Sequence, residues 1–246
     1  MRAAVLSDIH ANRQALEAVL EAVDEADVDQ IWCLGDLVGY GADPDTCTAL
    51  IRERADLCLV GNHDLALLGA IDISTFSEAA ATAVAWTREQ VSQETLEFLA
   101  TLEPTGSQNG IGLSHASPRD PVWEYVLSTD QAEAGLDALE ERMGLIGHSH
   151  IALYFTRAPG VRRGYAQGAQ ASDGAEIELA EGEWLLNPGS VGQPRDGDSR
   201  AAWLELDTEC WEARYHRVSY DIEAAAAAIR AAGLPDVLAE RLEVGR

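Results

Sequence analysis

The chain has 246 residues and a formal net charge of −25, because 42 acidic residues stand against 17 basic ones. All 17 basic residues are arginine, and so acidic a surface lacks the basic stripe on which nonspecific binding to nucleic acid depends. No apolar run approaches the roughly 20 residues that a membrane-spanning helix needs. Because no linker-like stretch divides the chain, we expect a single domain over residues 1–246 and no membrane association.

The start of the chain and its cysteines indicate in which cellular compartment the protein is expected. Residues 3–6 already look like a strand, and no basic region with a long apolar segment precedes them, which argues against export. Cys33, Cys47, Cys58 and Cys210 show no CxxC spacing. We therefore expect buried free thiols rather than disulfides or a thiolate zinc site, and a cytoplasmic protein.

The first strand is expected at residues 3–7, and it ends in a polar motif. Asp8 and His10 are two residues apart in extended backbone, so both side chains can address one point in space. Asn12 is expected to cap the following helix, whose apolar residues recur every three or four positions. A strand, a polar turn and an amphipathic helix thus form the first unit of an α/β pattern.

A second unit follows the first. The apolar run at residues 31–34 predicts a buried strand that ends at Gly35 and Asp36. Asp43 and Pro44 then have the residue types of a helix start, at the N-cap and first-turn positions.

A third strand, at residues 57–60, leads into the motif Gly61-Asn62-His63-Asp64. Strands that alternate with helices are expected to be parallel, so their carboxyl ends emerge on one edge of the sheet. Three successive strands therefore each finish with side chains that can bind a metal ion or transfer a proton. We expect these side chains to converge.

Residues 65–103 have a helical pattern, to which we assign no chemistry. Thr75 and Glu78 have the spacing of a capping box, and a second helix is expected to start near Ser92.

Short strands are expected after this helical region. Asn109-Gly110 is a hairpin signal, and a strand at residues 111–114 leads into His115.

Another helix is expected from Ser128, and it precedes an apolar strand that ends at His148 and His150, again two residues apart. Trp123 and Tyr125 are expected in a loop over the site or in its wall, with ordinary packing as the alternative.

The remainder of the chain predicts the overall architecture. Residues 151–220 are rich in strand patterns with Gly and Asn turns, an alanine-rich helix is expected at 221–232, and a short helix after Pro235. A second sheet that faces the first is the natural arrangement for this region. We predict an α/β fold, a four-layer αββα sandwich of two facing mixed β-sheets flanked by helices. The C-terminal helix could cover the core or support a homo-oligomer.

The distribution of histidine carries the chemical inference. Five of the six histidines lie at strand ends or in strand-end motifs, namely His10, His63, His115, His148 and His150. Histidine mixed with oxygen ligands suits Mn²⁺, Fe or Zn²⁺ better than Ca²⁺ or Mg²⁺. These side chains, with those of the aspartates and Asn62, are too many for one such ion, which favours a pair of ions about 3.5–4 Å apart.

Taken in order, these motifs resemble those of the calcineurin-like metallophosphoesterases over roughly residues 1–151. The segments that carry the resemblance are Asp8-Ile9-His10, Gly35-Asp36 through Gly41, Gly61-Asn62-His63-Asp64, His115 and Gly147-His148-Ser149-His150. The later segment Asn187-Pro188-Gly189-Ser190-Val191-Gly192 is similar to the small bacterial phosphodiesterase branch of that family.

The resemblance implies two divalent transition-metal ions, with Mn²⁺ as the first choice and Fe, Zn²⁺ or Ni²⁺ as alternatives. It implies that the first ion is held by Asp8, His10, Asp36 and His150, and the second by Asp36, Asn62, His115 and His148. Asp36 would bridge the ions, and a bridging hydroxide would attack phosphorus in line. His63, beside Asn62, would contact the substrate and protonate the leaving oxygen.

One position departs from the pattern. In the protein serine/threonine phosphatases of the superfamily, an aspartate three residues after the bridging one orients the catalytic histidine, whereas this chain has Gly39 there. The group that orients His63 is therefore unidentified, which weakens the protein-phosphatase hypothesis.

Two other residues are candidates for the substrate pocket. Arg195 follows the Asn-Pro-Gly-Ser-Val segment and could grip a phosphate oxygen bidentately, or it could form a salt bridge with Asp196 or Asp198. Tyr40 could line the pocket, with packing as the alternative.

We expect a dinuclear-metal-dependent phosphoesterase that hydrolyses a small phosphate ester, with a phosphodiester as the first choice. The alternatives are a dinucleoside-polyphosphate hydrolase, a protein phosphatase and a non-catalytic scaffold that binds a protein. The net charge disfavours a nuclease, although a cluster of Arg157, Arg162 and Arg163 could offset it.

Overall fold

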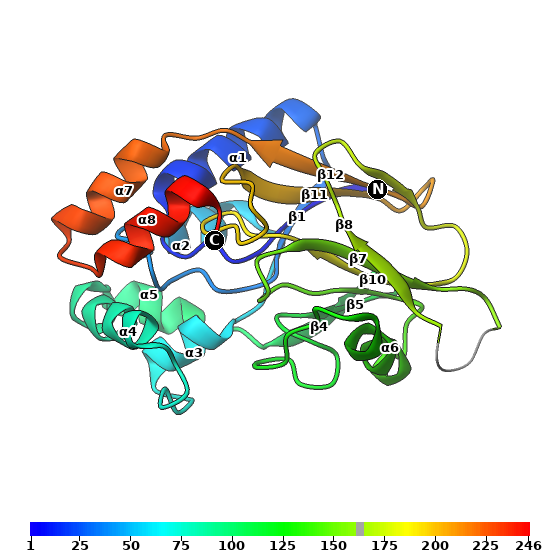
Figure 1. Ribbon diagram of the computed structural model, residues 1–246, viewed down its shortest axis with the longest axis horizontal. Coiled ribbons are helices and arrows are strands. Elements are labelled where there is room, and N and C mark those ends of the chain that lie inside the picture. Colours follow the sequence, from blue (N-terminus) through cyan, green and yellow to red (C-terminus); the bar gives the residue numbers. More distant parts are fainter. Residues whose placement is uncertain (161–164) are drawn as a thin grey trace.

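The computed structural model describes residues 1–160 and 165–246. These residues form two six-stranded mixed sheets and eight helices. The sheets stack face to face, with α1 (Arg13–Ala26) outside the first sheet and α6 (Thr129–Ala138) outside the second (Figure 1). The predicted four-layer αββα sandwich is confirmed.

The first sheet contains the three predicted parallel strands. Its order is β3-β2-β1-β11-β12-β9. The strands are β1 (Arg2–Leu6), β2 (Gln30–Cys33), β3 (Leu57–Cys58), β9 (Glu176–Glu178), β11 (Ala201–Asp207) and β12 (Glu212–Val218). β1, β2 and β3 are parallel, so their carboxyl ends share one edge, whereas β11 pairs antiparallel with β1.

The second sheet has the order β4-β5-β6-β10-β7-β8. Its strands are β4 (Thr105–Gln108), β5 (Ile111–Ser114), β6 (Met143–Leu145), β7 (Ala152–Arg157), β8 (Gln167–Gln170) and β10 (Glu183–Pro188). The predicted hairpin at Asn109-Gly110 joins β4 to β5, and both turn residues have positive φ, as a tight hairpin turn requires. Arg162 and Arg163 lie outside the described residues.

The expectation that residues 151–220 form the second sheet was wrong in part. β9, β11 and β12 belong to the first sheet, while β4, β5 and β6 belong to the second. The physical reason is burial: residues 201–204 of β11 are buried in succession, which fits only a central strand with α1 on one face and the other sheet on the other.

The main core lies between the sheets. Ala3, Val5 and Trp32 of the first sheet pack in one cluster with residues of β5, β6 and β10, and all three side chains are fully buried. The intervening residues of β1, Ala4 and Leu6, face α1 on the other side. This alternation fixes which face of β1 meets the second sheet.

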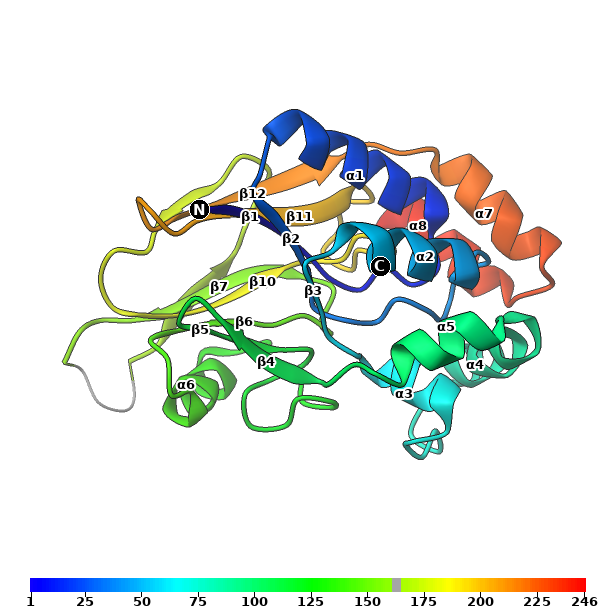
Figure 2. The same cartoon turned by 180° about the vertical axis from the view of Figure 1, so that it is seen from behind.

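The other six described helices gather at the end of the molecule where the predicted ligand motifs lie, as both views show (Figures 1 and 2). They are α2 (Pro44–Arg54), α3 (Asn62–Leu68), α4 (Glu78–Gln90), α5 (Gln93–Leu99), α7 (Ile222–Ala231) and α8 (Asp236–Val244). No helix of the described chain is both long and apolar enough to cross a bilayer.

Several expected helix starts are confirmed and one is wrong. Asn12, Ser92 and Ser128 each accept a hydrogen bond from a first-turn N–H, as expected. The capping box at Thr75 and Glu78 does not form, because Ser77 immediately precedes α4 and its hydroxyl accepts from the Ala80 N–H instead.

The cysteines are free, as expected, but they are not all buried. Cys33 and Cys47 are buried, Cys58 is half-buried and Cys210 is exposed. Cys210 lies in the turn between β11 and β12, where neither sheet covers it.

Candidate metal centre

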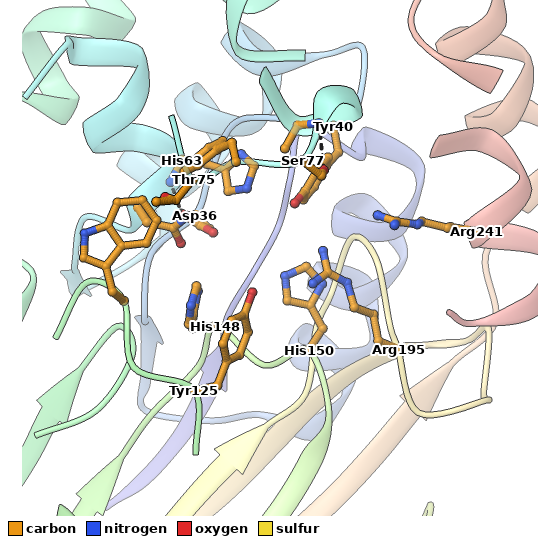
Figure 3. A pocket seen from close by; sticks show the side chains of 14 residues that line it. Asp36, Tyr40, His63, Thr75, Ser77, Tyr125, His148, His150, Arg195 and Arg241 are labelled. Carbon is orange, nitrogen blue, oxygen red and sulfur yellow. Dashed lines mark hydrogen bonds between the residues drawn. The ribbon is translucent and has the colours of Figure 1, made fainter. Parts of the chain in front are cut away.

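The side chains that follow the strands meet where the edges of the two sheets adjoin. Asp8, His10, Asp36 and Asn62 come from the first sheet, and His115, His148 and His150 follow β5 and β6 of the second. All seven are buried. Figure 3 shows Asp36, His148 and His150 directed into one cavity.

The backbone at these positions is unusual. Asp8, His10, Asp36, His148 and His150 all have φ between 49° and 63°, in the left-handed region that residues with a side chain rarely adopt. Each such residue costs about 1 kcal/mol or more, and such strain concentrates at functional sites. The backbone conformation of these five residues therefore indicates a functional site, as do their side chains, which can bind a metal ion.

The first group of potential ligands is Asp8, His10, Asp36 and His150, whose ligand atoms all lie within 4.8 Å of one another. His10 Nε2 lies 3.5 Å from Asp36 Oδ2, and His150 Nε2 lies 3.4 Å from Asp8 Oδ1. Ligands about 2.0–2.2 Å from a transition metal are separated from one another by roughly 3–3.5 Å. The spacing is that of one coordination shell.

The second group shares Asp36 with the first. Asp36, His115 and His148 also lie within the same 4.8 Å limit. His115 Nε2 is 3.6 Å from Asp36 Oδ2, the same oxygen that His10 approaches. Asn62 Oδ1 lies 3.1 Å from His115 Nε2. One carboxylate oxygen thus stands between two sets of nitrogen and oxygen atoms.

Buried polar atoms without hydrogen-bond partners indicate whether these residues are suited to bind a metal ion. Asp8 Oδ1, Asp36 Oδ2 and His148 Nε2 are buried and have no hydrogen-bond partner among the described residues. Leaving such groups unpaired is costly unless a ligand satisfies them. A cation at each group would satisfy all three, so the residues fit the metals that the fold implies.

Main-chain carbonyls set the orientation of three imidazoles. The Nδ1 atoms of His10, His115 and His150 lie 3.0, 2.9 and 2.6 Å from the carbonyl oxygens of Val38, Leu34 and Gln193. A carbonyl can only accept, so each Nδ1 carries the proton and each Nε2 keeps a lone pair that faces the centre. This is how metal-binding histidines are held in one tautomer.

Burial shifts the titration of the same groups. It raises the pKa of Asp8 to about 7 and that of Asp36 well above its usual value. It lowers the pKa of His148 to about 2, and the pKa values of His10 and His150 fall well below the usual value for the same reason. The imidazoles of His10, His148 and His150 are therefore neutral at pH 7, as metal binding requires, while burial favours the protonated forms of Asp8 and Asp36.

Sequence reasoning assigned no role to Asp64, which supports the site. Its carboxylate accepts hydrogen bonds from the N–H groups of Leu37, Val38 and Gly61, and so it ties the loop after β2 to the start of α3. In the sequence, the position of Asp64 in the Gly61-Asn62-His63-Asp64 motif could have indicated this supporting role.

The Asn187–Gly192 segment also has a structural role that sequence reasoning did not assign. The Asn187 amide donates to the Gly147 carbonyl, and the Ser190 hydroxyl donates to the Asp8 carbonyl. This segment therefore joins the ligand-bearing loops of the two sheets.

His63 lies at the same cavity but outside both ligand groups. Its Nδ1 is buried and has no partner among the described residues, and Gly39 packs against that side of the ring. Burial lowers the pKa of His63 to about 3. Among the residues that the structure describes, no carboxylate takes the place of the orienting aspartate, and the ring is held by packing against Tyr40 and Phe76, whose centroids lie 4.3 and 4.9 Å away.

The centre opens into a cavity of about 410 Å³. Trp123 and Tyr125 form part of its wall, as expected, and Tyr125 stacks on His148 with ring centroids 4.0 Å apart. Tyr40 and Arg195 line the same cavity.

The salt-bridge alternative for Arg195 is wrong. Asp196 pairs with Arg217, and Asp198 pairs with Arg200. Arg195 therefore stays beside the cavity, where its guanidinium lies 5.5 Å from the centre of the Tyr40 ring.

Comparison with known proteins places the chain in a family. Residues 1–209 match the calcineurin-like phosphoesterase superfamily domain. An uncharacterized protein of Methanocaldococcus jannaschii is 38% identical over 249 residues, and the alignment covers 99% of this chain and 98% of that protein.

Two solved structures are similar over the full chain. A metallophosphoesterase from Sphaerobacter thermophilus is 36% identical with a TM-score of 0.88, and the match covers 100% of this chain and 99% of that one. A hypothetical protein from Pyrococcus horikoshii has the same fold at 20% identity, with a TM-score of 0.79 and coverage of 100% and 98%. The chain belongs to the calcineurin-like phosphoesterase superfamily and is a metal-dependent hydrolase of phosphoric esters.

Proposed function

We propose that this enzyme hydrolyses a small phosphate ester, with a phosphodiester as the first choice, at a centre of two divalent metal ions. The observation that carries the proposal is the position of Asp36 Oδ2, which both groups of potential ligands share at the edge of an open cavity. A bridging carboxylate between two nitrogen-rich ligand sets is the arrangement of many two-metal phosphoesterases.

The residues would divide into two overlapping ligand sets. Asp8, His10, Asp36 and His150 would hold one ion, and Asp36, Asn62, His115 and His148 the other. The mixture of imidazole and oxygen ligands favours Mn²⁺, with Fe, Zn²⁺ or Ni²⁺ as alternatives. When bound, the ions would neutralise phosphate oxygens and lower the pKa of water, which supplies the nucleophile.

The other lining residues would bind and orient the substrate. His63 would contact the phosphate and protonate the leaving oxygen, and Arg195 would donate to phosphate oxygens. The aromatic side chains of Tyr125, Phe76 and Trp123 offer an apolar wall for the organic part of the ester, and Phe76 and Trp123 pack edge to face with centroids 5.6 Å apart.

The proposed setting is a single-domain cytoplasmic protein. The four cysteines are all free, which supports a reducing compartment. The arginine cluster that could favour a nuclease loses Arg157, whose guanidinium pairs with Asp137 and Glu183.

Hydrolysis of two chromogenic esters tests the proposal. Protein loaded with Mn²⁺ is expected to cleave bis-p-nitrophenyl phosphate, and p-nitrophenyl phosphate more slowly. If neither is cleaved while metal analysis finds two ions per chain, the catalytic proposal fails and a protein-binding scaffold becomes the better hypothesis.

The bridging role of Asp36 has a separate test. Asp36→Asn is expected to reduce the bound metal below two ions per chain and to abolish activity, because a neutral amide is a much weaker bridging ligand for two cations than a carboxylate. Asp72→Asn, at an exposed aspartate outside the cavity, is the matched control and should bind metal as the wild type does. Two ions and full activity in the Asp36 variant would contradict the role.

A further inference from the structure

The side of the cavity opposite the aromatic wall indicates which kind of substrate the site binds, and this inference rests on the proposed function. Two arginines line that side: Arg195, in the loop after β10, and Arg241, in α8. In Figure 3 both extend toward the cavity beyond His150, whereas Tyr125 lies across from them beside His148.

Most arginines of the described chain are neutralised by carboxylates. Those outside the cavity include Arg157, which pairs with Asp137 and Glu183, and Arg200, which pairs with Asp173 and Asp198. This is expected where 42 acidic residues outnumber 17 arginines.

Arg195 and Arg241 are not paired in this way, and neither are Arg88, Arg142 and Arg246, but of these five described arginines only Arg195 and Arg241 line the cavity. Within the described residues neither forms an ion pair: Arg195 donates to the Gln193 side-chain oxygen at 2.8 Å, and the Arg241 guanidinium makes no hydrogen bond. Asp196, the carboxylate next to Arg195, is buried in its pair with Arg217. Two guanidinium groups at one cavity repel each other, and an anion between them would relieve that repulsion.

The fold also fixes these two arginines relative to one another. The Arg195 N–H donates to the His150 carbonyl at 3.0 Å, which ties its loop to the metal centre. At the other end of the same loop, the Gly197 N–H donates to the carbonyl of Gly245, which caps the C-terminus of α8. The loop and the helix therefore hold a prearranged pair of cations, and such prearrangement lowers the entropic cost of binding.

We propose that Arg195 and Arg241 form a second phosphate site, so that among small phosphate esters the enzyme prefers one that carries a second phosphate beside the phosphate it cleaves. The phosphate to be cleaved lies at the metal centre, and its neighbour lies between the guanidinium groups. Guanidinium is suited to this role because it donates two parallel hydrogen bonds to phosphate oxygens. The flat organic part then lies toward Tyr125.

Binding of phosphonates tests the second site without relying on turnover. Calorimetry on Mn²⁺-loaded protein compares methylenediphosphonate with methylphosphonate, neither of which contains a hydrolysable P–O–P or ester bond. The wild type is expected to bind the diphosphonate at least about tenfold more tightly, and Arg241→Gln is expected to lose about tenfold of that preference, the effect of one charge-assisted contact. Metal analysis after each titration confirms that the diphosphonate has not stripped the ions.

Arg246→Gln is the matched control. It removes the same charge from an exposed arginine five residues further on that does not line the cavity, so it should keep the wild-type preference. If the two variants behave alike, the preference reflects overall charge and the second phosphate site is refuted.

A kinetic comparison separates this inference from the proposed function. The ratio of kcat/KM for a dinucleoside diphosphate to that for a dinucleoside monophosphate is expected to fall about tenfold in Arg241→Gln, through KM. A wild type that cleaves bis-p-nitrophenyl phosphate but shows no preference for two phosphates would refute the second site and leave the phosphoesterase proposal standing. A wild type that cleaves nothing would refute the proposed function, while the calorimetry would still decide whether Arg241 binds phosphate.

Discussion

At the scale of single residues, Gly39 is a position where an added side chain would disturb the proposed catalytic histidine. Its φ is +87°, and a Cβ atom there would collide with Nδ1 of His63. We expect Gly39→Ala to displace the His63 ring and to lower kcat at least about tenfold, because a small displacement of a reacting group costs one or two orders of magnitude. Metal content should stay at the wild-type level. Steady-state kinetics with metal analysis checks both.

Gly69→Ala is the matched control for backbone strain. Gly69 has a φ of +71°, but no atom outside its own chain neighbours lies within 4 Å of the point where a Cβ would stand, so the substitution adds strain without a collision. We expect it to cost about 1 kcal/mol of stability and to leave kcat unchanged. Equal losses of kcat in both variants would show that strain, rather than contact with His63, is responsible.

Substrates with different leaving groups test whether His63 acts as a general acid. Its pKa of about 3 and the lack of a partner at Nδ1 mean that it is neutral near pH 7 in the metal-free protein, so it needs the negative charge of a bound phosphate to carry a second proton. An alkoxide leaving group requires that proton, whereas p-nitrophenolate does not. We expect His63→Gln to lower kcat for an alkyl phosphodiester about 100-fold or more, and for the p-nitrophenyl ester much less. An equal loss for both esters would indicate that His63 binds the substrate but does not act as an acid.

At the scale of elements, helix α8 matters because it carries Arg241. Leu238 on α8 is fully buried in a cluster that includes Tyr40 and residues of α4 and α7. We expect Leu238→Ala to destabilise the protein by about 2–4 kcal/mol, since it leaves a cavity in this cluster. Val237→Ala, on the exposed face of the same helix, should change stability by less than about 1 kcal/mol. Urea unfolding of the metal-loaded protein measures both, and equal effects would mean that α8 is not docked as described.

The strand-end motifs could be predicted because their information is local. Asp8, Asp36 and His148 each follow an apolar run typical of a buried strand, and parallel strands bring such ends together. Arg241 could not be found in this way, because its helix was predicted but nothing local indicates that α8 packs over Tyr40. The place of β11 beside β1 was missed for the same reason, since it depends on which faces other elements cover.

At the scale of the whole molecule, the two facing sheets explain the unusual titration of the centre. Each sheet contributes potential ligands at its edge, so the carboxylates of Asp8 and Asp36 are closed off from water between them. Neither sheet alone would bury these groups or complete either ligand set. The site therefore forms only when the two sheets stack. The raised pKa values of Asp8 and Asp36 depend on that stacking.

This burial predicts how metal affinity depends on pH. Metal ions bind ionised carboxylates and neutral imidazoles, and burial lowers the pKa of His148 to about 2 and the pKa values of His10 and His150 well below the usual value, so those rings are neutral at pH 7. The competing protons are therefore those on the carboxylates. Because Asp8 has a pKa of about 7 in the metal-free protein, it is mostly ionised at pH 8 and mostly protonated at pH 6. Affinity for Mn²⁺ should thus fall as the pH drops below 7, by about tenfold per pH unit for this one proton, and more steeply if Asp36 is protonated as well.

Calorimetry between pH 5 and 8 checks this dependence. Titrations in buffers of different ionisation enthalpy count the protons released, and we expect release of at least one proton at pH 6 and fewer at pH 8. The reference is Asp72→Asn, which should show the same profile as the wild type because Asp72 is exposed and does not line the cavity. An affinity that stays constant from pH 5 to 8 without proton release would mean that the carboxylates are already ionised before metal binds. In that case the closure of the two sheets over the centre would have to be looser than the buried ligand set implies.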